Sequence, residues 1–212
     1  MNIYETKNMY FFCAPLIKGI NMIHICIINM QFYTNNICDI QHIFNKIENT
    51  VITIFNYKTP DILQQVKNMK PDAIIITGSK SRILYKNAYK LPKKLLDLNI
   101  PILGICYGYQ WLVKKTHGTI NTFGDKFHIY NKKLEINTPF KVSSKVYYFA
   151  HNDYITKIHD SWIPCIVHNN QIWMAYEPTK KIIGIQFHPE KKKSSGLAFF
   201  RAWVKWIIDT KK

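Results

Sequence analysis

Short apolar runs alternate with helix-period segments through the first half of the chain. Runs rich in isoleucine predict buried strands, and the amphipathic segments between them predict helices. The predicted strands cover 22–30, 51–57, 72–78 and a run from residue 101, and the predicted helices cover 36–47, 60–69 and 90–99. A polar, basic loop is predicted at 79–89. This alternation predicts an α/β fold: an open, mostly parallel sheet with helices on both faces and with sites at the carboxyl ends of its strands.

After residue 118 the pattern changes to closely spaced strands. They suggest a small antiparallel extension, with the last one or two strands returning to the central sheet; they cover 119–123, 126–130, 133–137, 145–150, 162–168, 171–177 and 181–187. An amphipathic helix is expected at 196–208. Residues 1–21 show no clear period and are interpreted as an N-terminal extension of uncertain structure, whereas 22–212 is interpreted as a single domain.

Charge and cysteine content narrow the classes of function. The formal net charge is +16, but only two arginines are present and the lysine clusters are not interleaved with aromatic residues, which argues against nucleic-acid binding. The five cysteines show no CxxC spacing, which fits a reduced compartment. The uncharged stretch at 19–33 is too short and too polar to span a bilayer. We therefore expect a cytoplasmic protein. The heavy use of Ile, Lys and Asn matches AT-rich codons, and if this bias reflects a viral source we expect the host cytoplasm.

The stretch GICYG places Cys106 between two glycines at the end of a predicted strand. This arrangement is typical of a nucleophile elbow, in which a sharp turn strains the nucleophile and the glycines relieve clashes. The following helix, predicted over 110–115, would put the sulfur at a helix N-terminus, where the dipole favours a thiolate. By itself the stretch leaves open whether Cys106 is a nucleophile or a packed thiol. The other cysteines lack this bracket and are interpreted as buried hydrophobic residues: Cys13, Cys26, Cys38 and Cys165.

A partner for the thiol is found in IIGIQFHPE. The apolar strand ends just before His188, and Glu190 stands two residues further on, so both side chains point the same way in an extended segment. Glu190 could then accept a hydrogen bond from one ring nitrogen of His188 and leave the other nitrogen facing the sulfur. A surface His-Glu pair is the alternative. The pair and the elbow in one chain favour a Cys-His-Glu site.

These stretches resemble the class I glutamine amidotransferases, the triad-type glutaminase domains. GICYGYQ is similar to the family's G-x-C-x-G-x-Q elbow and IQFHPE to its F-H-P-E motif; DAIIITGSKS, YFAHNDYIT and WMAYEP add to the resemblance, which is strongest to the glutaminase domain of GMP synthase. It implies a flavodoxin-like fold and hydrolysis of L-glutamine to glutamate and ammonia through a Cys106 γ-glutamyl thioester. It implies no metal and no cofactor.

The same resemblance assigns roles to individual residues. The implied catalytic residues are Cys106, His188 and Glu190; the implied oxyanion hole uses Tyr107, Gly78 and Ser79; and the implied substrate-binding residues are Gln110, Gly108, His151, Asn152 and Asp153. The chain departs from the family pattern where Ser79 and Lys80 replace a glycine and a proline, and where Ala150 and Asn152 replace a serine and a glycine.

Several functions stay open at this point. The leading hypothesis is a glutaminase that passes ammonia to a separate synthetase, for example one that makes GMP. The same triad would also serve a γ-glutamyl amide or peptide hydrolase. A non-catalytic module of the same fold and a basic nucleic-acid-binding protein are the remaining alternatives.

Overall fold

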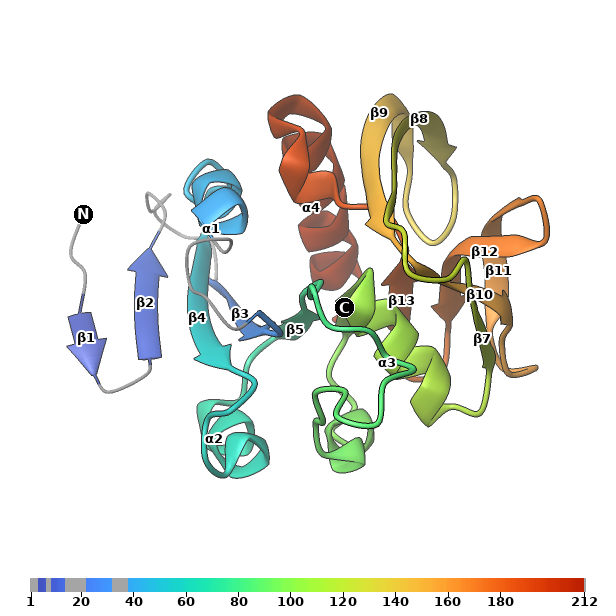
Figure 1. Ribbon diagram of the computed structural model, residues 1–212. Helices are drawn as coiled ribbons and strands as arrows, with labels where there is room; N and C mark the ends of the chain where they lie inside the picture. Colours follow the sequence, from blue (N-terminus) through green and yellow to red (C-terminus); the bar gives the residue numbers. More distant parts are fainter. Residues whose placement is uncertain (1–3, 7–8, 14–21, 32–37, 212) are drawn as a thin grey trace.

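A nine-stranded sheet forms the centre of the computed structural model, which describes residues 4–6, 9–13, 22–31 and 38–211 (Figure 1). The strand order is β1-β2-β4-β3-β5-β6-β13-β12-β11. The bounds are β1 Tyr4–Thr6, β2 Met9–Cys13, β3 Ile23–Asn29, β4 Thr50–Asn56, β5 Ala73–Ile76, β6 Ile102–Ile105, β11 Ile163–His168, β12 Gln171–Glu177 and β13 Ile182–Ile185. The five neighbours β4, β3, β5, β6 and β13 are parallel, and the strands outside them pair antiparallel. The predicted α/β class is confirmed.

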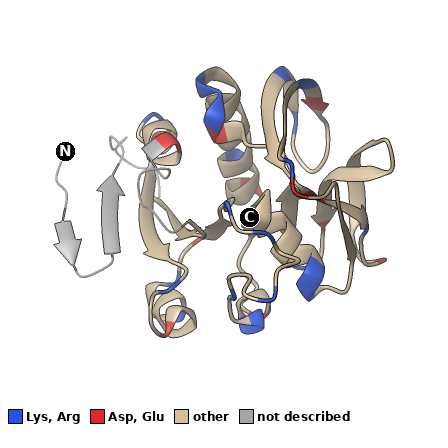
Figure 2. Cartoon of the chain, viewed as in Figure 1, with Lys and Arg blue, Asp and Glu red and all other residues tan. Residues whose placement is uncertain are grey.

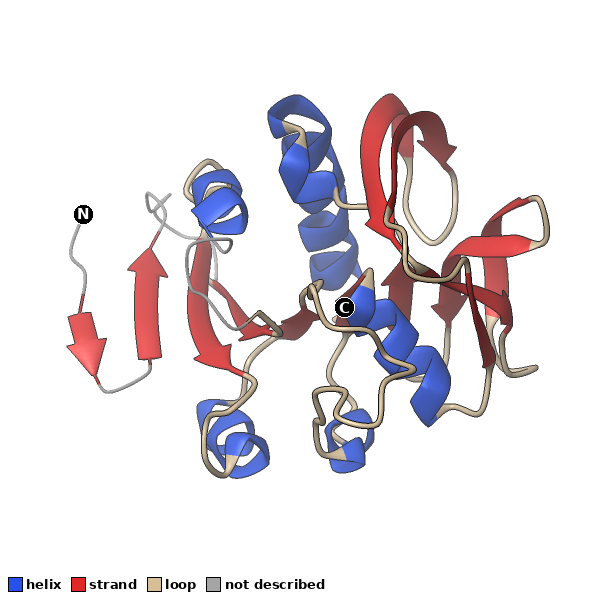
Figure 3. Ribbon diagram, in the orientation of Figure 1, coloured by secondary structure: helices blue, strands red, loops and turns tan. Residues whose placement is uncertain are grey.

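Helices cover both faces of this sheet because its central strands are apolar on both faces. On β3, for example, Ile25 and Ile27 join one buried cluster, whereas Cys26 and Ile28 join the other. The first cluster contains side chains of α1 (Cys38–Phe44) and α4 (Lys193–Asp209). The second contains side chains of α2 (Ile62–Met69), the 3-10 helix η2 (Lys93–Asp97) and α3 (Tyr107–Lys115). The helices of the two groups accordingly lie on opposite sides of the strands in Figure 3.

Two small antiparallel sheets flank the carboxyl end of the central strands. One pairs β7 (Thr119–Thr122) with β10 (Asp153–Lys157), and the other is the hairpin of β8 (His128–Ile136) and β9 (Val142–His151). The predicted antiparallel extension is thus confirmed. Its strand β9 is tied to the segment that follows β13, because the backbone N–H of His188 donates to the carbonyl oxygen of Tyr148 at 2.7 Å.

Several finer predictions were wrong. The strands predicted at 126–130 and 133–137 are one strand, β8, and three late strands rather than one or two join the main sheet. Strand β10 was not predicted, and the helix predicted at 90–99 is the short 3-10 helix η2. The lengths and pairing of these strands depend on the tertiary fold, which local periodicity does not report.

The predictions for the N-terminal region are only partly covered by the described residues. Of residues 1–21, strands β1 and β2 are described, and β2 pairs with β4; the rest of that segment and the first two residues of the helix predicted at 36–47 lie outside the described residues. The division at residue 22 stays a prediction. Cys26 is buried as expected, but Cys165 is only half-buried because β11 is the edge strand, and the side chains of Cys13 and Cys38 are outside the description. Within the described part, no helix is long and apolar enough to cross a membrane.

The start of α3 approaches β5 so closely that only glycine fits between them. A Cβ atom on Gly108 would lie 2.1 Å from the carbonyl oxygen of Ile76, and one on Gly104 would lie 2.7 Å from the backbone nitrogen of Tyr109 in α3. Real Cβ atoms do not approach other atoms so closely, so a side chain at either position would push the helix away from the sheet. These contacts fix the position of Cys106, which lies midway between the two glycines.

We expect Gly108→Ala to lower the free energy of unfolding by about 3 kcal/mol, because the added methyl group overpacks rigid backbone. Gly124→Ala is the control: no atom lies within 4 Å of its ideal Cβ, but its φ is +95°, so we expect a cost of about 1 kcal/mol from the left-handed backbone alone. Urea unfolding of both variants measures the difference. Equal losses of unfolding free energy in the two variants would show that the backbone contact between Gly108 and Ile76 is not rigid.

Candidate functional site

Three neighbouring parallel strands end at the same level of the sheet. Ile76 of β5 pairs with Gly104 of β6, and Ile105 of β6 pairs with Ile185 of β13. The residues that follow these strands therefore meet at one edge, as in other open α/β sheets. They are Gly78 and Ser79 after β5, Cys106 after β6, and His188 after β13.

Cys106 occupies a strained turn between β6 and α3. Its φ is +50° and its ψ is −102°, a conformation that costs an L residue about 1–3 kcal/mol. Its backbone N–H donates to the Ile185 carbonyl oxygen at 2.7 Å, and the first residue of α3 follows directly at Tyr107. The predicted elbow is therefore present in the geometry. The helix begins three residues earlier than predicted, which places the sulfur-bearing residue at its N-cap.

The sulfur of Cys106 lies in a polar environment although the residue is buried. The Gln186 amide Nε2 donates to Sγ at 3.4 Å, and the Ala150 carbonyl oxygen lies 3.7 Å from Sγ. Gln110 Nε2 donates to Gln186 Oε1 at 3.3 Å and to the Asp153 carbonyl oxygen at 2.7 Å. Gln186 was not predicted to be a site residue. Its position two residues before His188, at the carboxyl end of the same strand, was the available signal.

His188 and Glu190 form a hydrogen-bonded pair beside this thiol. His188 Nδ1 and Glu190 Oε1 are 2.7 Å apart, and both residues are at least nine-tenths buried. The segment Pro189–Lys191 is a 3-10 turn rather than the extended segment expected, but the turn still brings the two side chains together. Burial lowers the pKa of His188. The charges of Glu190 and Cys106, and the hydrogen bonds to both residues, together raise it by more than burial lowers it, so the pKa lies well above its usual value.

A narrow pocket lies beside Cys106. Its walls include many of the predicted residues: Ser79, Cys106, Tyr107, Gln110, His151, Asn152 and Asp153, together with Ser81, Arg82, Phe127 and Ala150. Its volume is about 10 Å³, roughly the room that one water molecule needs. A wider groove of about 450 Å³ adjoins it and shares Ser79, Phe127 and Ala150; His188, Tyr148 and Lys191 also line it. The thiol and the imidazole thus face two connected spaces of different width.

His151 is held by the protein on both ring nitrogens. Tyr130 Oη lies 3.2 Å from Nε2, and the Asp153 carbonyl oxygen lies 3.1 Å from Nδ1. Burial lowers its pKa to about 4, so the ring is neutral at neutral pH. Its side chain therefore serves to fix the wall of the pocket and the backbone of Asp153.

The turn after β5, at Gly78 and Ser79, lies directly against His188 and Cys106. A Cβ atom on Gly78 would lie 2.7 Å from His188 Cε1 and 3.5 Å from Cys106 Cβ, so only glycine allows this approach. Ser79, which replaces a glycine of the family pattern, is not among the residues with positive φ. Its backbone conformation is thus open to any L residue, and the serine does not distort the turn.

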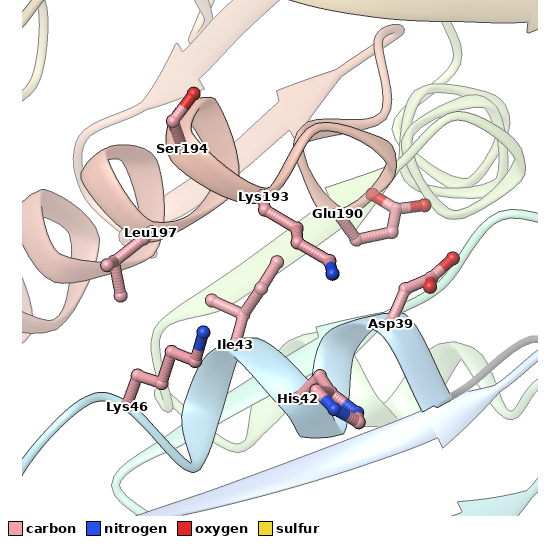
Figure 4. Close-up of a pocket in the computed structure, with 8 residues that line it drawn as sticks. All are labelled: Asp39, His42, Ile43, Lys46, Glu190, Lys193, Ser194 and Leu197. Atoms are coloured by element: carbon pink, nitrogen blue, oxygen red, sulfur yellow. The ribbon is translucent and has the colours of Figure 1, made fainter.

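A larger cavity, of about 490 Å³, lies behind Glu190 and does not include Cys106 (Figure 4). It is formed between α1 and the start of α4, and its walls are Asp39, His42, Ile43, Lys46, Glu190, Lys193, Ser194 and Leu197. Glu190 Oε2 is buried and has no hydrogen-bond partner among the described residues. This cavity is much larger than the narrow pocket, but the Cys106 thiol and the His188 imidazole, the reactive groups, do not line it. The described residues contain no group of three or more His, Cys, Asp or Glu side chains that could hold a metal ion.

Comparisons with known proteins identify the family of this chain. The family model "Glutamine amidotransferase class-I" matches residues 30–204. One similar protein is the GMP synthase [glutamine-hydrolyzing] of Prochlorococcus marinus (strain MIT 9312), which is 31% identical over 60% of this chain and 25% of the relative. Another is the GMP synthase [glutamine-hydrolyzing] of Borreliella burgdorferi (strain ATCC 35210), which is 35% identical over 65% of this chain and 27% of the relative. The chain thus spans about a quarter of the length of these relatives.

The fold agrees as well. A crystal structure described as one subunit of a GMP synthase, from Thermoplasma acidophilum, superposes with a TM-score of 0.68, covering 91% of this chain and 98% of the other at 16% identity, which supports the fold alone. The match of the family model over most of the chain confirms the resemblance found in the sequence. The protein belongs to the class I glutamine amidotransferase family.

Proposed function

We propose that this protein hydrolyses L-glutamine at Cys106, with His188 and Glu190 as its catalytic partners. The single observation that carries the proposal is the contact of a strained thiol at a helix start with a buried His-Glu pair. The thiolate forms a bond to the side-chain amide carbon, and the carbon–nitrogen bond breaks as ammonia leaves with a proton from His188. Water then attacks the thioester, which releases glutamate and returns a proton to the sulfur through His188.

The electrostatics of His188 support this role. Its raised pKa keeps the imidazole protonated beside the sulfur, so the leaving nitrogen finds a proton donor at neutral pH. Glu190 bonds Nδ1 and leaves Nε2 for the reacting groups. General acid catalysis of this kind contributes about 10²- to 10⁴-fold in rate.

The oxyanion and substrate assignments form the second part of the proposal. The N–H group of Tyr107 at the start of α3 and a backbone N–H of the Gly78–Ser79 turn would stabilise the developing oxyanion. Gln110, Gly108 and the 151–153 segment would form the glutamine subsite, since most of them line the pocket that contains Cys106. Because that pocket is narrow, its walls must separate before glutamine can enter, which fits an activity that depends on a partner.

The third part concerns the fate of the ammonia. The relatives' names, GMP synthase [glutamine-hydrolyzing] and a GMP synthase subunit, support a separate synthetase of the GMP synthase type as the acceptor. The wide groove at His188 is the exit that the geometry offers, and Lys80 and Lys191 on its wall would face an acidic partner surface. Figure 2 shows Lys and Arg spread over several elements, including α2, α3, α4 and the β8–β9 hairpin, rather than gathered in one nucleic-acid-binding stripe.

The covalent intermediate gives the first test. A chloroketone analogue of glutamine should add covalent mass at Cys106, and Cys106→Ala should lower glutamine hydrolysis, measured as ammonia released, by about 10⁴-fold or more. The same change should shift the melting temperature by less than about 4 °C, since alanine keeps the backbone and removes one sulfur atom.

Cys165→Ala is the matched control, because Cys165 is a half-buried thiol outside the site, on edge strand β11. It should leave both labelling and hydrolysis unchanged. An unlabelled, folded protein with reduced Cys106 would contradict the glutaminase proposal and favour a non-catalytic module. Faster hydrolysis of a γ-glutamyl peptide than of glutamine would instead favour the peptide hydrolase.

The His188–Glu190 pair gives the second test. Glu190→Gln removes the charge that raises the pKa of His188, so the NMR titration of the His188 ring should move to lower pH and glutamine hydrolysis should fall by roughly 10²-fold. In the unchanged protein the raised pKa contributes stability that is present below about pH 6.5 and is lost as pH rises through the folded pKa; Glu190→Gln should weaken this dependence.

Glu177→Gln is the control, because Glu177 is also buried but lies on β12, where its carboxylate accepts a hydrogen bond from the Lys180 N–H. This change should leave the His188 titration where it is. If Glu190→Gln also left it in place, the carboxylate would not control the imidazole.

A further inference from the structure

Arg82 links three separate segments at the wall of the narrow pocket. It lies in the loop after β5, and its guanidinium Nε and Nη2 donate to Asp153 Oδ1 at 3.2 and 2.9 Å. Nη1 donates to Asp125 Oδ1 at 3.0 Å, and Nη2 also donates to the Thr122 hydroxyl. The Tyr85 ring lies 4.9 Å from the guanidinium carbon. No role was predicted for Arg82, one of only two arginines in the chain.

The two carboxylates that Arg82 contacts lie in different environments. The side chain of Asp153 is 1% exposed and that of Asp125 is 97% exposed, whereas that of Arg82 is 11% exposed. An ion pair at the surface is screened by water and contributes little, whereas a buried carboxylate depends on its partner. Asp153 is therefore the partner through which Arg82 acts.

Arg82 uses only one of the two oxygens of Asp153. Both short contacts go to Oδ1, and Oδ2 is buried without a hydrogen-bond partner among the described residues. The backbone of Asp153 is fixed independently by Gln110, whose Nε2 donates to its carbonyl oxygen at 2.7 Å. With the backbone and Oδ1 both held, the direction of Oδ2 is fixed as well. A buried carboxylate oxygen in this state lacks a donor, and a cationic donor suits it best.

This oxygen belongs to the same pocket as the sulfur. Asp153, Arg82 and Cys106 all line it. An amino acid whose side-chain amide meets Cys106 would carry its α-ammonium group on the opposite end, toward the pocket wall. The proposed glutamine subsite thus needs an acceptor for a cation, and Asp153 Oδ2 is a buried acceptor for which the described residues supply no donor.

We propose that Arg82 is a positioning residue, which holds Asp153 so that Oδ2 accepts the α-ammonium group of the substrate. The inference rests on the proposed glutaminase function and adds the residue that shapes the amino-acid subsite. Binding then depends on the charge of the α-amino group, so N-acetylglutamine, whose amide nitrogen carries no charge, should be a poor substrate.

Two alkylating reagents separate this role from a structural one. Iodoacetamide has no amino-acid group, whereas the chloroketone analogue of glutamine carries one, and both modify Cys106. In Arg82→Gln, labelling of Cys106 by the chloroketone should slow by more than about 10-fold, while labelling by iodoacetamide stays within about twofold of the unchanged protein. Where hydrolysis is measurable, KM for glutamine should rise more than kcat falls.

Asp125→Asn and Arg82→Lys complete the comparison. Asp125→Asn removes the exposed partner of Arg82 and should leave both labelling rates within about twofold. Arg82→Lys keeps the charge but loses the planar fork, so chloroketone labelling should slow several-fold; this variant carries the test if Arg82→Gln does not fold. Folding is checked by the melting temperature of each variant.

The outcomes that overturn the inference are distinct. Unchanged chloroketone labelling in the folded Arg82 variants would show that Arg82 does not position the substrate acceptor. Equal slowing with both reagents would show a structural role alone, and faster labelling with both would show that Arg82 only closes the pocket. No chloroketone labelling of the unchanged protein would instead overturn the glutaminase proposal, and this inference with it.

Discussion

The backbone at Cys106 is held in a conformation that L residues avoid, and tight packing on both sides of it keeps it there. Gly104 and Gly108 let α3 approach β5 and β6 so closely that the turn between strand and helix has no room to relax. Its N–H is also bonded to the neighbouring strand β13. The strain of about 1–3 kcal/mol is offset by the buried apolar contacts of α3, which contribute more. The direction of the sulfur, and with it the position of every group that faces it, depends on this turn.

The two carboxylates of the site follow the same physical pattern. Glu190 uses Oε1 for the His188 ring, and Asp153 uses Oδ1 for the Arg82 guanidinium. In both residues the second oxygen is buried without a partner among the described residues. A buried charge is tolerated only when it is paired, and each pair uses a single oxygen for this purpose. The two residues border different spaces: Asp153 lines the narrow pocket, whereas Glu190 lines the larger cavity behind the site.

Local sequence patterns were sufficient for the parts of the site that short segments build. The elbow at Cys106 and the pair at His188 and Glu190 each lie within a few residues of chain, so composition and spacing could predict them. The five parallel strands β3, β4, β5, β6 and β13 are largely continuous apolar runs, and these were also predicted. Arg82 and Gln186 were missed because their partners lie far away, 71 residues from Arg82 to Asp153 and 80 from Gln186 to Cys106. Pairing across such distances depends on the fold. The position of β11 at the edge of the sheet and the full length of β8 also depend on the fold.

The order of strands in the sheet has a consequence for synthesis of the chain on the ribosome. Strand β6 delivers the thiol, but its neighbour β13 is made only after the two small sheets and the strands β11 and β12. Chains emerge and begin to fold from the N-terminal side during translation, at about 5–20 residues per second. A nascent chain would therefore display Cys106 for several seconds before His188 and Glu190 emerge. The candidate site is thus completed only when β13, the last strand to be made, has emerged.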